Sequence, residues 1–430
     1  MKEEREKLLK YFMEVEGVCT DTRNIKPGAL FFALKGDNFN GNRYAGDALK
    51  KGCRYAVVDD TDFYQKNDSR YILVNDVLSA LQNLACDYKN TLNAKVIAIN
   101  GSNGKTTTKE LSAAVLTKKY HVAATPGNFN NHIGLPLTIL GAPRNTEILL
   151  LEMGDNKPGD IDELCRIAEP HYGIITNIGK DHIEGFGTFE GNIKSKDELF
   201  RYLALTGGSV LYNSEIDYVP ELAARVEHKI PYGTGESINL KLLKNNPFLL
   251  YSEPYETREY QTKLIGNYNF ENLLTAYALG VTFDVPTDDI HDALTSYEPR
   301  NNRSQWIQTR AGNDIILDAY NANPSSVEPA LQNFHDLQTD KKKLVLLGDM
   351  LELGATSAEE HENMVQLLRV LEFDEVILTG SEYKKTAGDF LCFTTTNETR
   401  AYLEKENITN RAVLIKGSRS LKLETLVDVL

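Results

Sequence analysis

The chain has 430 residues, which at about 150 residues per domain suggests about three domains. Lysine and arginine total 47 against 61 aspartate and glutamate residues, so the net charge is −14. This acidic balance argues against a general binder of nucleic acid or anionic membrane, which needs a broad basic surface. A hydrophobic content of 41% and a charged content of 25% are typical of a soluble globular protein.

The cysteines and the N-terminus narrow the class further. The five cysteines lie far apart in sequence and form no C-x-x-C pair, so neither a zinc site nor a disulfide framework is predicted. This usage fits a reducing cytoplasm. The charged opening of the chain lacks the apolar segment of a signal peptide. Apolar runs such as residues 29–34 are too short to span a bilayer, so no integral membrane association is expected.

Residues 1–92 are predicted to form a small α/β domain. A helix-like opening precedes two short apolar strands at residues 28–34 and 55–59, and a helix follows at 77–88.

Residues 93–297 are predicted to form a P-loop ATPase-like domain with a mostly parallel sheet. A β-branched strand at 95–100 leads into a glycine loop and a helix at 107–119. Two further strands, 147–153 and 172–179, are almost continuously apolar, as strands buried on both faces are. Residues 213–262 are expected to form antiparallel excursions, and a helix at 269–280 closes the domain.

Residues 298–430 alternate strand and helix, which predicts a Rossmann-like doubly wound domain. The strands are expected at 314–320, 343–350, 375–380 and 411–418, and the helices at 327–336, 358–371 and 397–405. The predicted fold class is therefore α/β in three domains, and ligands should bind at the carboxyl ends of the strands.

The most specific local motif is a phosphate-binding loop. Its glycines allow backbone N–H groups to surround phosphate oxygens, its lysine reaches the terminal phosphates, and a threonine hydroxyl can bind Mg²⁺. The glycine that usually begins a P-loop is replaced by Ile99, so this is a shortened G-x-x-G-K-T form. The alternative is a glycine-rich turn that carries a lysine by chance. The predicted ATP-binding residues here are Gly101, Ser102, Asn103, Gly104, Lys105, Thr106 and Thr107.

Two further side chains follow predicted parallel strands and are candidate metal ligands. Glu152 ends the strand at 147–153, and His182 follows the strand at 172–179. A carboxylate and an imidazole at one sheet edge could hold Mg²⁺ against a γ-phosphate. Taken singly, Glu152 could instead cap a helix and His182 could be a solvated loop residue.

These motifs, together with L-E-M-G at 151–154 and N-I-G-K-D-H-I-E-G-F-G at 177–187, resemble the Mur ligase family of peptidoglycan synthesis. The resemblance implies ATP-dependent amide formation through an acyl phosphate, with two Mg²⁺ ions. It also implies a carbamylated lysine within residues 194–200, which is Lys196 by position, with Lys194 as the alternative. Thr106 and Glu152 would then hold one metal ion, and His182 and Lys196 the other.

The resemblance extends over essentially the whole chain and suggests the substrates. Residues 20–41 look like the family's uridine-nucleotide segment, which assigns Thr22 and Arg23 to the substrate. Residues 125–140 look like the loop in which Asn130 and Asn131 lie near the substrate. Residues 318–331 look like the segment of those members that add D-alanyl-D-alanine to UDP-N-acetylmuramoyl-tripeptide. The alternatives are a ligase that adds one amino acid, a folylpolyglutamate-type ligase, and outside this class a kinase or a nucleotide-gated binding protein.

The remaining site residues are also implied by the resemblance. Asn269 and Asn272 are expected near the adenine, with Tyr268 in place of the usual histidine. Arg303 is the best match to an arginine that contacts nucleotide phosphate, and Arg300 is the alternative. The contacts expected to ATP or to the dipeptide come from Asp318, Tyr320, Asn321 and Asn323, although Asp318 could be a helix cap and the asparagines ordinary loop residues. Lys105 is expected to act directly in catalysis, and the enzyme is expected to be a cytoplasmic monomer.

Overall fold

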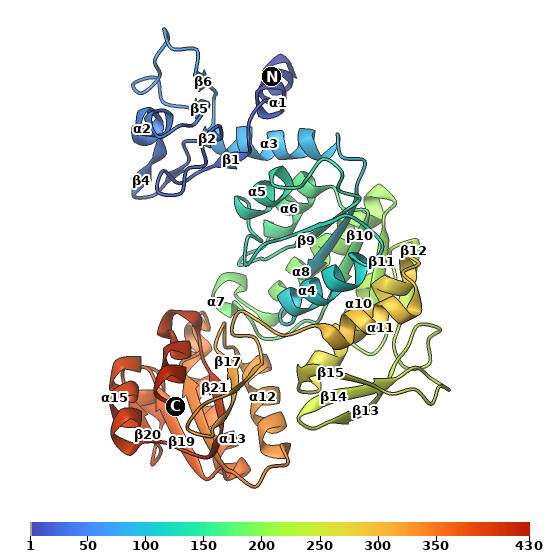
Figure 1. The fold of residues 1–430 in the computed structure, drawn as a ribbon, viewed down its shortest axis with the longest axis vertical. Coiled ribbons are helices and arrows are strands. Elements are labelled where there is room, and N and C mark those ends of the chain that lie inside the picture. The colour runs from blue at the N-terminus through green and yellow to red at the C-terminus, as the bar shows by residue number, and fades with distance from the viewer. Residues whose placement is uncertain (1) are drawn as a thin grey trace. The chain divides into compact units, whose positions relative to one another are not determined.

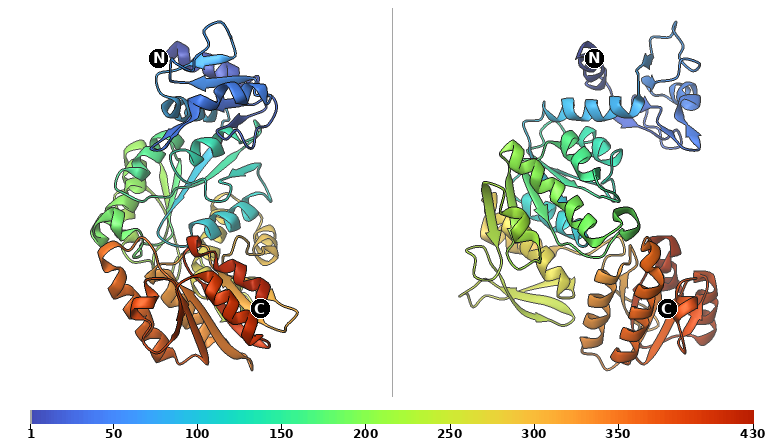
Figure 2. Two further views of the ribbon diagram at one scale, coloured as in Figure 1. Left: turned by 90° about the vertical axis from the view of Figure 1, so that its left-hand side faces the viewer. Right: turned by 180° about the vertical axis from the view of Figure 1, so that it is seen from behind.

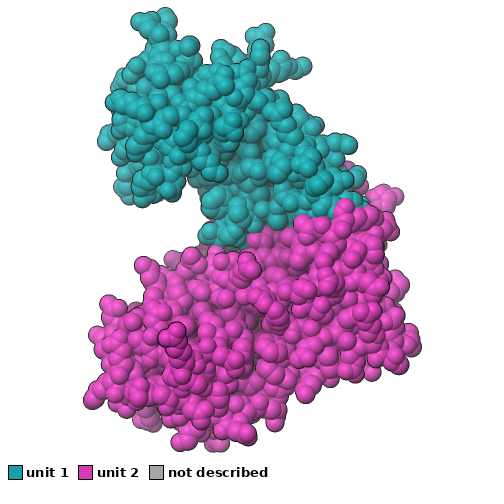
Figure 3. All heavy atoms as spheres, in the orientation of Figure 1, with its two compact units in different colours: residues 1–99, 120–155, 159–173 teal, residues 100–119, 156–158, 174–430 magenta. Residues whose placement is uncertain are grey.

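The computed structural model describes residues 2–430 and divides into two compact units. One unit comprises residues 1–99, 120–155 and 159–173, and the other comprises residues 100–119, 156–158 and 174–430, as coloured in Figure 3. Within residues 2–430, no helix combines the length and apolar composition that crossing a bilayer requires.

The first unit begins with a small parallel sheet in the order β1-β2-β5-β6. Its strands are short because they pack only a small core, in which Phe31, Ala56 and Val58 meet Ala45 and Ala48 of a helix. The elements are α1 (Lys2–Phe12), β1 (Val18–Cys19), β2 (Leu30–Phe32), β3 (Lys35–Gly36), β4 (Phe39–Asn40), α2 (Ala45–Lys50), β5 (Tyr55–Val58), β6 (Tyr71–Leu73) and α3 (Val77–Lys89). The predicted α/β unit is confirmed.

A second sheet has the strand order β12-β11-β10-β7-β9-β8. The pairing of β7 with β9 is parallel, as the continuous apolar strands predicted, and it places Ile99 opposite Glu152. The elements are β7 (Lys95–Asn100), α4 (Lys105–Leu116), β8 (Val122–Ala124), α5 (Gly134–Leu140), β9 (Ile148–Glu152), α6 (Asp160–Ala168), β10 (Tyr172–Ile175), α7 (Ile183–Phe186), α8 (Phe189–Thr206), β11 (Ser209–Asn213), α9 (Val219–Ala223) and β12 (His228–Tyr232).

The antiparallel prediction for residues 213–262 is only half right. Strand β12 pairs with β11 in parallel, because α9 carries the chain back across the sheet between them. The antiparallel strands form a separate three-stranded sheet, β13 (Lys241–Asn245), β14 (Phe248–Ser252) and β15 (Tyr260–Ile265). Helices α10 (Tyr268–Thr282) and α11 (Thr287–Ser296) follow.

The C-terminal segment is a doubly wound sheet with the order β16-β17-β21-β18-β19-β20. All pairings are parallel except that of β16 with β17. Helices α12 and α13 pack on one face, and α15 packs on the other (Figures 1 and 2). The elements are β16 (Gln305–Gln308), β17 (Asp314–Asp318), α12 (Pro324–Asp336), β18 (Lys342–Gly348), α13 (Ser357–Leu371), β19 (Glu375–Thr379), α14 (Tyr383–Thr386), β20 (Leu391–Phe393), α15 (Thr396–Glu406) and β21 (Arg411–Lys416).

Candidate active site

The phosphate loop joins the end of β7 to the start of α4 (Figure 1). Gly101 and Gly104 both have a positive φ, 138° and 78°, which a residue with a side chain adopts only with strain. The Lys105 ammonium lies over the loop, where it donates to the carbonyl oxygens of Gly101 and Ser102. The backbone N–H of Asn103 donates to Oδ1 of Asn177 at 2.9 Å. The predicted strand–loop–helix context of the motif is therefore present.

Gly104 is the position where this loop tolerates substitution least. A Cβ atom there would overlap Oδ1 of Asn272 on α10, in addition to the strain of its positive φ. We expect Gly104→Ala to lower the free energy of unfolding by more than 2 kcal/mol and to weaken ATP binding, as denaturant unfolding and calorimetry would show. The matched control is Gly235→Ala, with φ of 85° and no atom within 4 Å of its Cβ, which should cost only about 1 kcal/mol. Equal losses for both variants would contradict this account.

Asp181 lies at the centre of a buried polar cluster that the sequence analysis did not identify. Its carboxylate accepts hydrogen bonds from Ser102 Oγ at 2.5 Å and from Asn192 Nδ2 at 2.6 Å. Lys196 Nζ lies 3.5 Å from its other oxygen. Asp181 therefore connects the phosphate loop to α8. The signal for it was present, since it directly precedes His182 in the quoted motif.

The charge of Asp181 is set by two opposing effects. Burial raises the pKa of its carboxyl, but Lys196, Lys105 and the Ser102 hydroxyl together bring that pKa below its ordinary value. The cluster therefore carries an anionic carboxylate beside two lysines at neutral pH.

Lys196 and Lys194 have different environments. The Lys196 side chain is fully buried on α8, with its ammonium 5.1 Å from the Phe186 ring centre, whereas Lys194 is exposed. Burial and the neighbouring carboxylate distinguish Lys196 as the lysine of the cluster.

In the first unit, Glu152 is held at the end of β9. Asn130 Nδ2 donates to Oε1 of Glu152 at 2.9 Å, and the backbone N–H of Glu152 donates to Thr125 Oγ1 at 2.9 Å. The side-chain Oδ1 of Asn131 accepts from the N–H groups of Ile133 and Gly134 at the start of α5, and the assignment of Asn130 and Asn131 to the substrate stays a prediction. Asn130 therefore orients a candidate metal ligand, and Asn131 shapes the following turn.

His182 and its neighbours contact the C-terminal segment. His182 Nδ1 lies 2.7 Å from Oε2 of Glu352, and Lys180 Nζ lies 2.8 Å from Oε1 of Glu360. His182 has a φ of 47°, so the turn that presents it is a strained one for a non-glycine residue. His182 is thus not a solvated loop residue.

The two asparagines assigned to the adenine are buried against the phosphate-loop helix. Asn272 accepts from Thr108 Oγ1 at 2.9 Å and donates to Asn269 Oδ1 at 2.9 Å, and Asn269 donates to the carbonyl oxygen of Ile265. Tyr268, in place of the family's histidine, has its hydroxyl 2.9 Å from Ser304 Oγ. These contacts fix α10 beside α4.

Two arginines lie close to the ring of Tyr320. The Arg303 guanidinium carbon is 3.9 Å from its ring centre and that of Arg419 is 4.8 Å away. Nε of Arg303 is buried and has no hydrogen-bond partner, whereas Arg300 is exposed. Asp318 is not a helix cap, because its carboxylate accepts from Lys416 Nζ at 2.6 Å and from the Ser304 N–H at 3.2 Å.

The remaining predicted substrate residues make local contacts. Arg23 forms an exposed ion pair with Asp21, and the carbonyl oxygen of Thr22 accepts from Lys51 Nζ at 2.9 Å. Asn321 Oδ1 accepts from the following backbone N–H, and Asn323 caps α12 by accepting from the Ser326 N–H. The structure therefore shows that Asn323 caps α12, a role that the sequence analysis did not name, and the substrate contacts expected of Asn321 and Asn323 stay predictions.

The chemistry of these side chains fits magnesium. Within residues 2–430, no three His, Cys, Asp or Glu side chains form a group that could hold a metal ion by themselves. In the second unit, the hydroxyl of Thr106 and the carboxylate of Asp181 are oxygen donors, and in the first unit the carboxylate of Glu152 is another; oxygens of this kind suit Mg²⁺. Beside Asp181, Oδ1 of Asn192 is buried without a hydrogen-bond partner. An ion bound by Thr106 or Asp181 would need further ligands from phosphate, water or a modified lysine.

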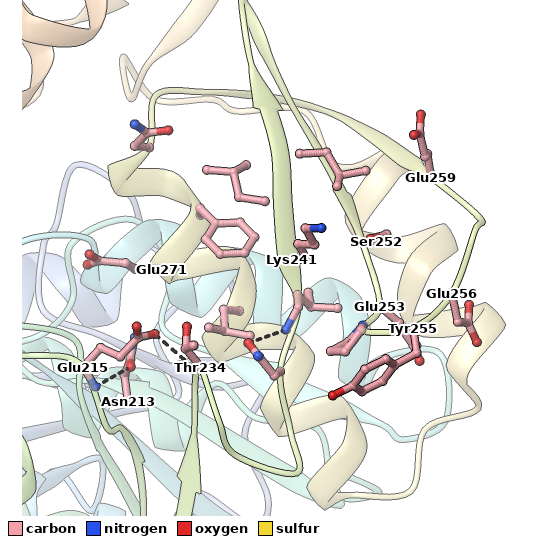
Figure 4. Close-up of a pocket in the computed structure, with 18 of the residues that line it drawn as sticks. Asn213, Glu215, Thr234, Lys241, Ser252, Glu253, Tyr255, Glu256, Glu259 and Glu271 are labelled. Carbon is pink, nitrogen blue, oxygen red and sulfur yellow. Dashed lines mark hydrogen bonds between the residues drawn. The ribbon is translucent and has the colours of Figure 1, made fainter.

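A cavity of about 1110 Å³ lies away from the phosphate loop, between the ends of β11 and β12, the three-stranded sheet and α10 (Figure 4). No predicted site residue lines it. Figure 4 shows Glu215 and Glu271 at the same end of this cavity. Burial and the nearby Glu215 carboxylate raise the pKa of Glu271 to about 7.

This raised pKa makes stability depend on pH. The folded chain favours protonated Glu271, so its contribution is complete below about pH 4.5 and is lost as the pH rises through about 7. We expect Glu271→Gln to raise the free energy of unfolding by up to about 3 kcal/mol at pH 8 and to have little effect at pH 4.5. Denaturant titrations at both pH values measure this, with exposed Glu259→Gln as the control. An equal gain at both pH values would contradict the assignment.

Comparison with known proteins places the chain in a family. Residues 14–89, 99–280 and 302–419 match families described as "Mur ligase family, catalytic domain", "Mur ligase middle domain" and "Mur ligase, glutamate ligase domain". A Bacillus subtilis protein named UDP-N-acetylmuramoyl-tripeptide–D-alanyl-D-alanine ligase is 34% identical, over 96% of this chain and 92% of its own length. The chain belongs to the Mur ligase family.

Solved structures agree with this placement. A crystal structure of MurF from Acinetobacter baumannii has a TM-score of 0.87 and 27% identity, covering 98% of this chain and 97% of that chain. The MurF ligase from Thermotoga maritima in complex with ADP has a TM-score of 0.85 and 26% identity over the same shares. The resemblance drawn from the sequence motifs and the predicted three-part α/β fold are both confirmed as those of a Mur ligase. The exact domain boundaries at 92 and 297 stay predictions.

Proposed function

We propose that the chain joins D-alanyl-D-alanine to UDP-N-acetylmuramoyl-tripeptide with the consumption of ATP. The observation that carries this proposal is the similarity to the Bacillus subtilis ligase of that activity over 96% of the chain. The phosphate loop, Glu152, His182 and Lys196 are the groups that we propose to act in phosphoryl transfer. The alternative of a ligase that adds a single amino acid gains no support, because that relative is named for the dipeptide.

Formation of the amide requires an activated carboxylate. In the proposed reaction the γ-phosphoryl group of ATP passes to the tripeptide carboxylate, giving an acyl phosphate, and the dipeptide amine then displaces phosphate. Both reactants of the first step are anions, so positive charge has to be supplied where they meet. Lys105 and the N-terminus of α4 supply part of that charge from the chain itself.

The proposed metal ligands follow from the same requirement. Thr106 and Glu152 would hold one Mg²⁺ ion, and His182 with a carbamylated Lys196 would hold a second. When bound, Mg²⁺ would lower the negative charge that the two substrates present to each other. Three observations support this set. Glu152 is opposite Ile99, which precedes the phosphate loop in sequence; Asn130 orients its carboxylate; and the Lys196 amine is fully buried.

Nucleotide contacts are proposed for Arg303, for Asn269 and Asn272, and for Asp318. Arg303 would bind a phosphate, since its Nε is buried without a partner and its guanidinium is stacked on Tyr320. Asn269 and Asn272 would face the adenine, and Asp318 would contact ATP or the dipeptide. Contacts to the UDP-linked substrate are proposed for Thr22, Arg23, Asn130 and Asn131. Contacts to the dipeptide are proposed for Tyr320, Asn321 and Asn323. Monomeric state and cytoplasmic location stay predictions.

The test is phosphate release with ATP, Mg²⁺, UDP-N-acetylmuramoyl-tripeptide and D-alanyl-D-alanine, with one component omitted at a time. We expect sustained release only with all components present. Release that does not need the dipeptide, or no release with either the lysine or the diaminopimelate form of the tripeptide, would overturn the proposed function.

A further inference from the structure

The side chain of Asn103 lies in the phosphate loop but makes its hydrogen bonds to a distant part of the chain. Its Oδ1 accepts from Asn323 Nδ2 at 3.0 Å, and its Nδ2 donates to Ser325 Oγ at 2.9 Å. Ser325 Oγ in turn donates to Asn323 Oδ1 at 3.0 Å. The three side chains therefore form a closed ring of hydrogen bonds, in which Asn103 is more than 200 positions away from the other two residues.

Asn103 and Asn323 are both held in place by hydrogen bonds outside this ring. The backbone of Asn103 is fixed from its own side of the unit, because its N–H donates to Asn177 Oδ1 and its carbonyl oxygen accepts from Thr176 Oγ1 at 2.6 Å. Asn323 is fixed by the start of α12, where its Oδ1 also accepts from the Ser326 N–H at 2.9 Å. The ring thus connects the phosphate loop to the N-terminus of α12, which its own capping hydrogen bonds hold in place.

The segment that follows β10 packs closely against the start of α12. A Cβ atom on Gly179, which follows β10, would overlap Ser325 Oγ, so only glycine leaves room for the start of α12 there. Lys180 and Glu360, at 2.8 Å, form a further contact between the same two regions. Asp318, Tyr320 and Asn321 precede Asn323 directly and are carried by the same segment.

We propose that Asn103 is a positioning residue, whose amide docks the segment 318–326 onto the phosphate loop and so sets the place of the dipeptide-side residues relative to ATP. This inference rests on the proposed function. A side-chain amide is suited to the task because it donates and accepts at once, and both capacities are used here.

A double-mutant cycle tests the ring. Asn103→Ala removes the amide, and Asn323→Ser removes the partner amide while keeping a good helix cap. We expect each variant to lower kcat/KM for D-alanyl-D-alanine about tenfold, as two hydrogen bonds between neutral groups would. The double variant should fall by about the same factor as each single variant, and KM for the UDP-linked substrate should stay unchanged. Independent losses that multiply to about a hundredfold would overturn the proposal.

A second readout does not depend on ligation. Hydrogen exchange of the free enzyme should become faster at backbone amides 321–326 in Asn103→Ala, although the substitution is more than 200 residues away. Asn245→Ala, which removes an amide hydrogen bond to Asn267 elsewhere in the unit, is the control and should leave those amides unchanged. Unchanged exchange at 321–326 in Asn103→Ala would overturn the docking role. If the wild-type enzyme fails to ligate while exchange responds as expected, the proposed function fails and the docking contact stands.

Discussion

Replacing Lys196 by alanine is expected to lower the rate of phosphate release by about a thousandfold. The reason is that the fully buried Lys196 amine lies 3.5 Å from Asp181 and, once carbamylated, would supply oxygen ligands beside the phosphate loop. A short carboxylate such as formate should restore part of the rate, because it can occupy the space that the carbamate leaves. Steady-state assays with and without formate measure both effects.

The matched control for this prediction lies two residues away. Lys194 is exposed on the same helix, so Lys194→Ala should keep the wild-type rate within about twofold and should not respond to formate. If Lys194→Ala lowered the rate of phosphate release more than Lys196→Ala did, the carbamate would have to be assigned to Lys194. Loss in Lys196→Ala without any rescue, accompanied by a lower unfolding free energy, would indicate that the buried lysine has a structural role only.

Replacing Lys105 by methionine is expected to lower kcat by about a thousandfold or more while the chain stays folded. The Lys105 ammonium lies over the phosphate loop, where it donates to the carbonyl oxygens of Gly101 and Ser102. Methionine keeps much of the length of lysine but removes its charge. The negative charge of the transferring phosphoryl group would therefore lose a cation that the phosphate loop supplies. Single-turnover phosphate release measures the loss.

Lys118→Met serves as the control for Lys105→Met. Lys118 follows the same helix and pairs with Asp292 at the surface, so its loss should change kcat less than twofold. If Lys105→Met retained more than about a tenth of the wild-type kcat, the proposed role of Lys105 in phosphoryl transfer would be wrong.

The functional residues that could be predicted from the sequence are those that follow one another directly in the chain. The loop from Gly101 to Thr107 could be predicted because its strand, glycines, lysine and helix are consecutive. Parallel strands were predicted from their continuous apolar runs, but β12 was missed because a short helix reverses the chain before it. Local propensity contains little information about which strands pair, since pairing depends on the crossover.

Contacts between distant residues could not be predicted in the same way. Asp181 was overlooked because its importance comes from Ser102, which is 79 positions away in sequence and 2.5 Å away in space. The hydrogen bond between Asn103 and Asn323 could not be predicted either, because the two residues are 220 positions apart, and their assignments to ATP and to the dipeptide stay predictions. Likewise, the sequence did not show that the side-chain Oδ1 of Asn131 accepts from two backbone N–H groups at the start of α5, and the assignment of Asn131 to the substrate stays a prediction.

We propose that the chain forms an amide through an acyl phosphate on the UDP-linked tripeptide. This step can be followed by labelling both oxygens of the reacting tripeptide carboxylate with ¹⁸O and tracing the label by mass spectrometry during ligation to D-alanyl-D-alanine. We expect one ¹⁸O atom in each molecule of released phosphate, together with a product heavier by the dipeptide. Product without label in the phosphate, or labelled phosphate without product, would contradict this proposal.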